Sequence, residues 1–158
     1  MKLKTLGQVI LSIIICEAAG LIGSIFTTPN IPTWYATLQK PSFAPPNWVF
    51  GPVWTTLFAL MGIAAYLVWR RGTKNKIVKS ALFIFGCQLA LNIMWSVLFF
   101  GLQSPEAAFV EIIILWLAIA LSIRAFFKVS KPAAYLLLPY IAWVTFAGFL
   151  NYMIAVLN

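Results

Sequence analysis

The sequence predicts an all-α integral membrane protein, a bundle of five transmembrane helices with a long ordered loop between helices 1 and 2. Hydrophobic residues make up 63% of the 158 residues and charged residues only 9%, whereas soluble domains are roughly 45–50% apolar and about 25% charged. Five apolar segments each approach the ~20 residues that a helix needs to cross a bilayer. Lipid offers the backbone no hydrogen bonds, so continuous apolar segments predict helices rather than the alternating strands of a barrel.

The five segments form one expected domain over residues 1–158. The predicted spans lie near residues 6–26, 48–69, 81–102, 107–127 and 134–157. The first span is longer than the roughly 7–15 apolar residues of a signal peptide, so we expect it to be retained. It contains the small-residue pairs Ala19 with Gly23 and Gly20 with Ser24, which allow close helix approach. That contact lies either within the chain or in a dimer.

Helix-start signals precede three of the later spans. Asn47 follows two prolines and is a candidate N-cap of the second span. Ser104 and Pro105 begin the fourth span, and Ser130 and Pro132 begin the fifth in the same way. Ser and Asn side chains accept hydrogen bonds from the first turn, and proline is tolerated there. These signals support separate helices.

The connection near residues 28–47 is unusually long and aromatic. It overlaps the segment Trp34–Trp54, which reads WYATLQKPSFAPPNWVFGPVW. Proline fixes φ and removes a backbone donor, so this segment is stiff. Loops of this length are usually lids or binding loops. We therefore expect a lid over an apolar pocket at the membrane surface.

The basic residues divide unevenly between the two sides of the bundle. Ten of the eleven lie on the side of the N-terminus, namely Lys2, Lys4, Arg70, Arg71, Lys74, Lys76, Lys79, Arg124, Lys128 and Lys131. Only Lys40 falls on the other side. The positive-inside rule then predicts a multi-pass protein of a prokaryotic cell membrane, with the N-terminus cytoplasmic and the C-terminus outside. The alternative is the mitochondrial outer membrane. The net charge of +8 reflects this asymmetry, so we expect a lipid bilayer as partner and no nucleic acid.

Polar and aromatic side chains share particular helix faces. Gln88, Asn92 and Ser96 recur every four residues, so they lie on one face of the third span. Polar groups at membrane depth face the bundle interior, where they either form interhelical hydrogen bonds or line a cavity. Trp143 lies one turn from the small Ala147 on the fifth span, which leaves space beside its indole.

Aromatic rings from several spans therefore predict a ligand cavity, mostly apolar with a few polar groups. The expected walls are Trp54, Phe58, Trp95 and Trp143, and the expected roof is Tyr35 and Phe43. The predicted ligand-binding residues are Tyr35, Phe43, Trp54, Phe58, Gln88, Asn92, Trp95, Trp143, Ala147 and Leu150. We expect the ligand to be a hydrophobic small molecule, because flat aromatic molecules stack on indoles.

Acidic residues are few, and Glu17 lies midway through the first span. An acid inside the membrane is a functional candidate by default. It is either protonated and hydrogen-bonded to another helix or a proton-coupling group. The second possibility gives the alternative function, a small secondary transporter.

The sequence excludes most enzyme chemistry. It contains no histidine and no aspartate, which rules out His-based triads, most metal sites and paired-carboxylate catalysis. We expect no metal site and no obligatory cofactor. The commonest protein ligand of haem iron is also absent.

Three sequence blocks carry a resemblance to a known family. They are Trp34–Trp54, then Leu89–Gly101 (LALNIMWSVLFFG), then Leu137–Tyr152 (LLPYIAWVTFAGFLNY). Together they resemble the TspO/translocator protein family, also called the tryptophan-rich sensory or peripheral-type benzodiazepine receptor family. The resemblance implies a homodimeric membrane receptor or sensor that binds tetrapyrroles, such as porphyrins and haem precursors, and related flat apolar ligands. In the absence of histidine, a tetrapyrrole would be a ligand rather than a fixed cofactor. The alternative transporter would then carry porphyrin or sterol-like ligands.

The resemblance also implies roles for individual residues. Trp54 and Trp143 match tryptophans that are tied to light-dependent porphyrin breakdown in bacterial relatives, and photochemistry through tryptophan is the one enzymatic activity left open. The chain departs from the family at Phe43, where many relatives have tryptophan. It also lacks the basic residue after Tyr152 that a C-terminal sterol motif needs.

Overall fold

The computed structural model describes residues 2–158, with side chains from residue 5 onward. These residues form helices and connecting segments, and no strand occurs among them. Five segments are long and apolar enough to cross a membrane. The protein is therefore an all-helical, multi-pass membrane protein, as its composition predicted. The side chains of Lys2 and Lys4, which contribute to the charge asymmetry, lie outside the described ones.

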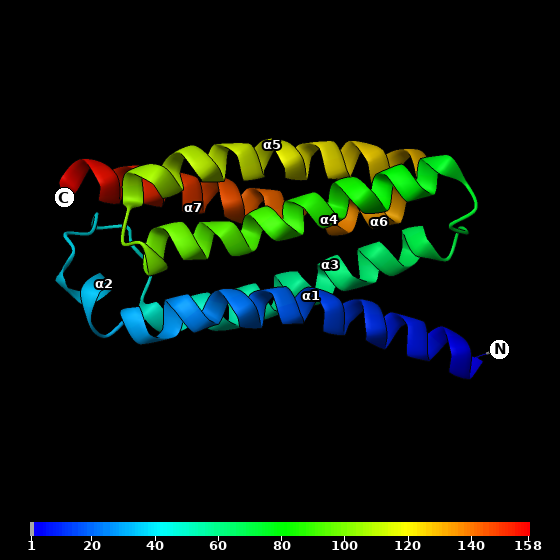
Figure 1. Ribbon diagram of the computed structural model, residues 1–158, viewed down its shortest axis with the longest axis horizontal. Coiled ribbons are helices and arrows are strands. Elements are labelled where there is room, and N and C mark those ends of the chain that lie inside the picture. Colours follow the sequence, from blue (N-terminus) through cyan, green and yellow to red (C-terminus); the bar gives the residue numbers. More distant parts are fainter. Residues whose placement is uncertain (1) are drawn as a thin grey trace.

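The long helices run side by side, with the two ends of the chain at opposite ends of the bundle (Figure 1). The spans are α1 (Lys2–Asn30), α3 (Phe50–Trp69), α4 (Lys76–Ser96) with the π-helical turn η2 (Val97–Gly101), α5 (Pro105–Val129), and α6 (Lys131–Leu136) with α7 (Leu138–Leu157). The short elements are α2 (Trp34–Thr37) and the 3₁₀ turn η1 (Asn47–Val49). A helix lies at each predicted span, and most helices extend beyond the apolar segment that predicted them.

The helix-start signals had different outcomes. Ser104 is the N-cap of α5, and its hydroxyl accepts a hydrogen bond from the Ala107 N–H at 3.4 Å. The prediction for Asn47 was wrong, because the residue lies inside η1, which leads directly into α3. Ser130 precedes α6 without a side-chain cap hydrogen bond. Pro139 lies in the first turn of α7 and has no N–H to donate back, so α6 and α7 are separate helices.

Glycines let α1 approach its neighbours closely. A Cβ on Gly62 of α3 would lie 2.5 Å from the Ile13 Cα, so the two backbones touch there. Gly20 of α1 faces the Phe58 ring, and Gly23 faces Ser96 of α4. In lipid, small residues provide this kind of contact because helices then gain dispersion contacts along their backbones. Gly20 and Gly23 therefore make these close contacts within the chain.

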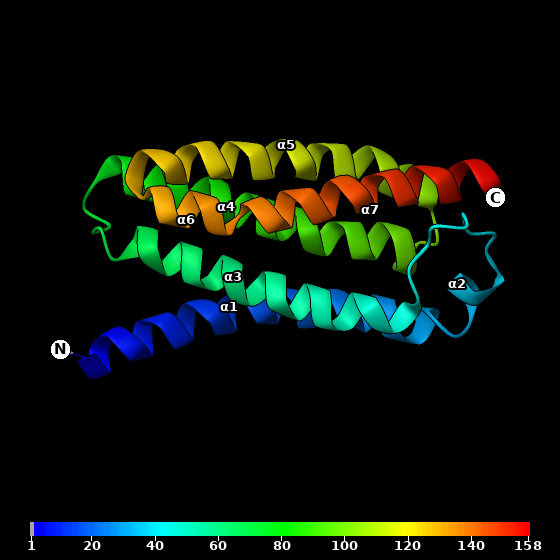
Figure 2. The same ribbon diagram turned by 180° about the vertical axis from the view of Figure 1, so that it is seen from behind.

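Residues 31–46 connect α1 to η1 at the end of the bundle where α7 ends (Figure 2). The connection starts later than predicted, because α1 continues to Asn30. Tyr35 and Trp34 pack against rings of η2, with centroid distances of 5.7 Å from Tyr35 to Phe100 and 5.5 Å from Trp34 to Phe99. These rings hold the first half of the connection against α4.

The second half of the connection is held by α7. The Gln39 N–H donates to the Asn158 side-chain oxygen at 2.9 Å, and the Asn158 amide nitrogen donates back to the Gln39 carbonyl at 3.0 Å. Phe43 stacks on Phe149 with a centroid distance of 5.3 Å. The connection is thus attached to both sides of the bundle.

The glycine contact predicts the effect of a single added methyl group. Gly62→Ala places a Cβ against the Ile13 backbone, which cannot move without displacing α1. We expect the free energy of unfolding to fall by roughly 1–3 kcal/mol, as it does when a core is overpacked. Thermal unfolding in detergent micelles, followed by circular dichroism, measures the loss.

Gly86→Ala is the matched control. Nothing lies within 4 Å of its added Cβ, and alanine favours a helix over glycine by about 1 kcal/mol. The control should unfold at the same or a higher temperature than the unmodified protein. Equal unfolding temperatures for the two variants would contradict the α1–α3 contact.

Candidate functional site

A cavity of about 410 Å³ lies within the bundle and below residues 31–35. Its volume is within the roughly 300–1,000 Å³ of small-molecule sites. Its wall is mostly apolar and aromatic, with a minority of hydroxyl, amide and carboxyl groups. The lining residues are Glu17, Gly20, Leu21, Gly23, Ser24, Thr27, Thr28, Ile31, Tyr35, Asn47, Trp48, Phe50, Gly51, Trp54, Thr55, Phe58, Asn92, Trp95, Ser96, Phe99, Phe100, Trp143, Ala147, Leu150, Asn151 and Ile154.

Helix α1 supplies the most polar wall of the cavity. Glu17, Gly20, Ser24, Thr27 and Ile31 all line it, and they are spaced by alternating steps of three and four residues. That spacing places them on one helix face. A single face of α1 therefore runs along the cavity from Glu17 to the end of the helix.

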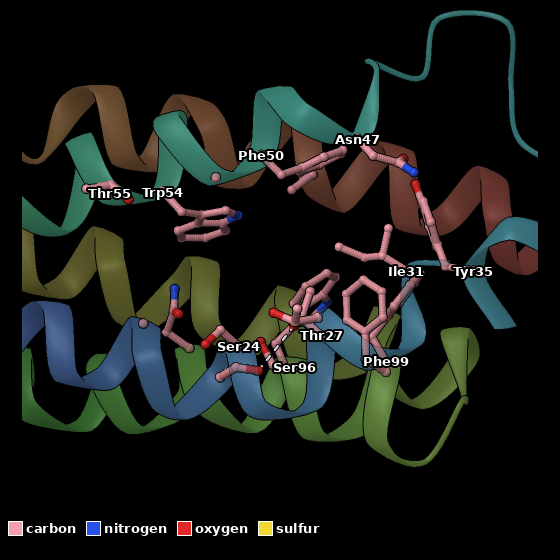
Figure 3. A pocket seen from close by; sticks show the side chains of 18 of the residues that line it. Ser24, Thr27, Ile31, Tyr35, Asn47, Phe50, Trp54, Thr55, Ser96 and Phe99 are labelled. Atoms are coloured by element: carbon pink, nitrogen blue, oxygen red, sulfur yellow. Dashed lines mark hydrogen bonds between the residues drawn. The ribbon is translucent and has the colours of Figure 1, made fainter. Parts of the chain in front are cut away.

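Helix α3 supplies an aromatic wall opposite. Phe50 and Trp54 project from α3 into the space across from Ser24, Thr27 and Ser96 (Figure 3). The Trp54 ring lies 5.6 Å from the Phe58 ring and the Phe50 ring lies 6.0 Å from Trp143 of α7, centroid to centroid. Rings from two spans therefore meet at the cavity, as the sequence predicted.

The α4 side of the cavity is held in place by hydrogen bonds. The Trp95 ring stacks on Phe99 at 5.0 Å, and its indole N–H donates to the Asn151 side-chain oxygen at 3.0 Å. The Asn151 amide nitrogen in turn donates to the Pro105 carbonyl at 2.7 Å. Because Trp95 is bonded to α7, its ring is fixed in the cavity wall.

Most of the predicted ligand-binding residues lie together at this cavity. Those that line it are Tyr35, Trp54, Phe58, Asn92, Trp95, Trp143, Ala147 and Leu150. Phe43 and Gln88 do not line it. That these residues bind a ligand stays a prediction.

Phe43 and Gln88 have other contacts. Phe43 lies over α7, stacked on Phe149 and 41% exposed, so it does not roof the cavity. Gln88 is buried one turn before Asn92, where its side-chain oxygen accepts a hydrogen bond from the Tyr140 hydroxyl at 2.9 Å. The Asn92 amide nitrogen donates to the same hydroxyl at 2.9 Å. Gln88 thus forms an interhelical hydrogen bond, one of its two expected roles.

Tyr35 closes the cavity at the end opposite Thr55 (Figure 3). Burial raises the pKa of its phenol, so the group is a neutral donor at physiological pH. The Lys40 ammonium lies over the Tyr35 ring, 4.7 Å from its centroid. A positive charge is therefore held close to this end of the cavity.

Two buried polar groups lack hydrogen-bond partners in the described part of the chain. One is the carboxyl group of Glu111 on α5, in which neither oxygen has a partner. The other is the indole N–H of Trp143. Glu111 is 6% exposed, so its carboxyl group is buried in the bundle. Buried polar groups are nearly always paired, so these two are exceptions.

The surroundings of Glu17 differ from the first of the two roles expected for this acid, an interhelical hydrogen bond. Its carboxyl group makes no hydrogen bond to another helix among residues 5–158, so the expected interhelical bond is absent. It lines the cavity instead. Three further lining residues were not predicted from the sequence, although their spacing from Glu17 could have identified them: Ser24, Thr27 and Ile31.

Comparisons with known proteins give a consistent answer. The family model described as "TspO/MBR family" matches residues 12–157. "Tryptophan-rich protein TspO" of Chlorobaculum tepidum is 49% identical over 144 residues, 91% of each chain. The protein of the same name in Archaeoglobus fulgidus is 47% identical, covering 96% of this chain and 97% of its own length. "Translocator protein" of Bos taurus is 41% identical, covering 84% of this chain and 79% of its own.

Removal of the Tyr140 hydroxyl should destabilise the protein, because this group bonds to two buried side chains below the cavity. Tyr140→Phe removes the partner of Gln88 and of Asn92 at a buried position. We expect the free energy of unfolding to fall by roughly 1–3 kcal/mol, because the two amide groups would stay buried without this hydrogen-bond partner. Thermal unfolding in micelles tests this against Tyr135→Phe, a change at a tyrosine that is 57% exposed. Equal unfolding temperatures for the two variants would show that the network adds nothing.

Proposed function

The chain belongs to the TspO/MBR family, and from that premise we propose that it is a membrane receptor or sensor that binds tetrapyrroles and related flat apolar ligands. The cavity is the proposed site. Relatives of this chain carry the names tryptophan-rich protein and translocator protein, and neither name states a ligand. The ligand class is therefore argued from the cavity itself.

The observation that carries the proposal is the set of indole rings at the cavity. Trp48, Trp54, Trp95 and Trp143 all line it, and they come from η1, α3, α4 and α7. An aromatic pair contributes about 0.5–1.5 kcal/mol beyond the area that it buries. A flat ring system can contact several of these rings at once, whereas a flexible chain contacts them less completely.

The polar groups fit a ligand with a few hydrogen-bonding substituents. Ser24, Thr27, Ser96 and Asn92 line the same cavity, and porphyrins carry both ring nitrogens and acidic side chains. The printed sequence has no histidine, so the proposal treats a tetrapyrrole as a ligand held by stacking and hydrogen bonds. No metal enters the proposal.

We propose in addition that residues 31–46 act as an ordered lid. Tyr35 lines the cavity while its ring packs on η2, and Gln39 is bonded to Asn158 at the end of α7. In this proposal Ile31 and Tyr35 lie between the cavity and the membrane surface. A ligand would be enclosed between the aromatic walls and this segment.

The placement in the cell is part of the proposal. The loops after α3 and α5 and the N-terminus lie at one end of the bundle (Figure 1), and ten of the eleven basic residues lie on this side. In a prokaryotic cell membrane this end would be cytoplasmic, and the lid would face outward. We also propose a homodimer, on the family resemblance.

A secondary transporter is the second candidate, because Glu17 lines the cavity rather than packing against another helix. Proton-driven uptake of porphyrin into proteoliposomes, abolished by Glu17→Gln, would favour transport. Binding without uptake would favour the receptor.

Tryptophan fluorescence tests the proposed site directly. We expect protoporphyrin to quench the fluorescence of the purified protein, with affinity reduced several-fold in Trp54→Phe and Trp143→Phe. Each change removes an indole that lines the cavity. Trp116→Phe is the matched control, because Trp116 is 38% exposed, bonds to Thr145 and does not line the cavity.

The same variants test the light-dependent breakdown that the family resemblance implies. Absorbance of bound protoporphyrin under illumination should decay more slowly in Trp54→Phe and Trp143→Phe than in Trp116→Phe. If the affinity and the decay rate of both cavity variants match those of the control, the site assignment is wrong.

A further inference from the structure

Glu17 has the only charged side chain among the residues that line the cavity. It lies at the start of the cavity-lining face of α1, and Ile31, directly after the last residue of α1, lies at the other end of the same row of lining residues. Fourteen residues separate Glu17 from Ile31, which corresponds to about 21 Å along a helix. The carboxyl group is therefore at the inner end of an elongated cavity, far from the lid.

Nothing in the described cavity wall neutralises this acid. The polar side chains that line the cavity with it are hydroxyls and amides, among them Ser24, Thr55, Asn92 and Ser96. No lysine or arginine lines the cavity. A carboxylate beside an apolar wall attracts an opposite charge more strongly than it would in bulk water, and no residue of the described cavity wall supplies that charge.

We propose that Glu17 determines ligand specificity, so that the cavity binds flat aromatic ligands with a basic nitrogen placed against this carboxyl group. This inference rests on the proposed function, because it requires a flat ligand in this cavity. Phe58 and Trp54 lie on the facing helix, with ring centroids 5.6 Å apart. Aromatic faces attract cations, so a protonated ring nitrogen would be held by the carboxyl group and the rings together.

The charge near the lid end of the cavity has the opposite sign to that of Glu17. The Lys40 ammonium lies 4.7 Å from the Tyr35 ring centroid, and the Tyr35 ring forms the end wall. Acidic substituents of a ligand are attracted to that end and repelled by Glu17. The geometry therefore also sets an orientation, with basic nitrogen inward and carboxylates toward the lid.

Two probes of similar size and opposite charge test the proposal. They are 9-aminoacridine, a cation at neutral pH, and 9-anthracenecarboxylate, an anion. Their affinities are measured by tryptophan quenching of the protein in phosphatidylcholine nanodiscs, with empty nanodiscs to correct for partitioning. We expect the unmodified protein to bind the cation at least tenfold more tightly than the anion.

Three variants separate the local role of Glu17 from general charge and from misfolding. Glu17→Gln should bring the affinity ratio of the two probes close to one. Glu106→Gln removes an exposed acid that does not line the cavity, and it should keep the original ratio. Adding Ser24→Asp to Glu17→Gln restores a carboxyl group two turns along the same cavity-lining face, so the cation preference should return.

The outcomes distinguish this inference from the proposed function. If protoporphyrin still quenches the fluorescence but Glu17→Gln leaves the probe ratio unchanged, the role of Glu17 is refuted and the receptor function stands. If Glu106→Gln lowers the ratio as much as Glu17→Gln does, surface charge accounts for the selectivity and the inference fails. If neither the probes nor protoporphyrin bind the unmodified protein, both proposals are wrong.

Discussion

The close approach of α1 to α3 is the contact on which the cavity depends. At Gly62 the α3 backbone touches the Ile13 backbone, and one turn further along α1 the cavity begins at Glu17. Gly20 then allows the Phe58 ring to lie across the inner end. Since lipid gives helices no hydrophobic reason to associate, such close packing is what holds α1 in place. A larger residue at Gly62 would separate the helices at the point that closes the site.

Polar groups in the bundle divide between structure and site. Gln88 and Tyr140 bond to each other below the cavity, and Asn92 bonds to Tyr140 while also lining it. The Tyr140 ring lies 6.2 Å from Trp54, edge to face. The hydrogen-bonded network thus supports the indole at the inner end of the cavity, and Asn92 links the two regions.

The sequence predicted the spans and eight of the residues that line the cavity, because both follow from local patterns. Apolar length identifies helices, and Trp54, Trp95 and Trp143 lie where the resemblance and the helix faces expected them. Gln88 could not be assigned in this way, since periodicity gives the face of a helix but not the depth at which a cavity ends. The position of the Phe43 ring depends on the path of an irregular connection, and local sequence patterns do not determine that path.

Glu111 shows why burial of an acid is hard to infer from sequence. It lies near the start of α5 in an otherwise apolar sequence, and both carboxyl oxygens are buried without partners among the described residues. An unpaired buried acid is costly in any protein and more so within lipid. That cost is smaller for Glu17, because its side chain is only partly buried and borders the cavity. The two acids therefore differ in access rather than in residue type, since Glu17 lines the cavity and Glu111 does not.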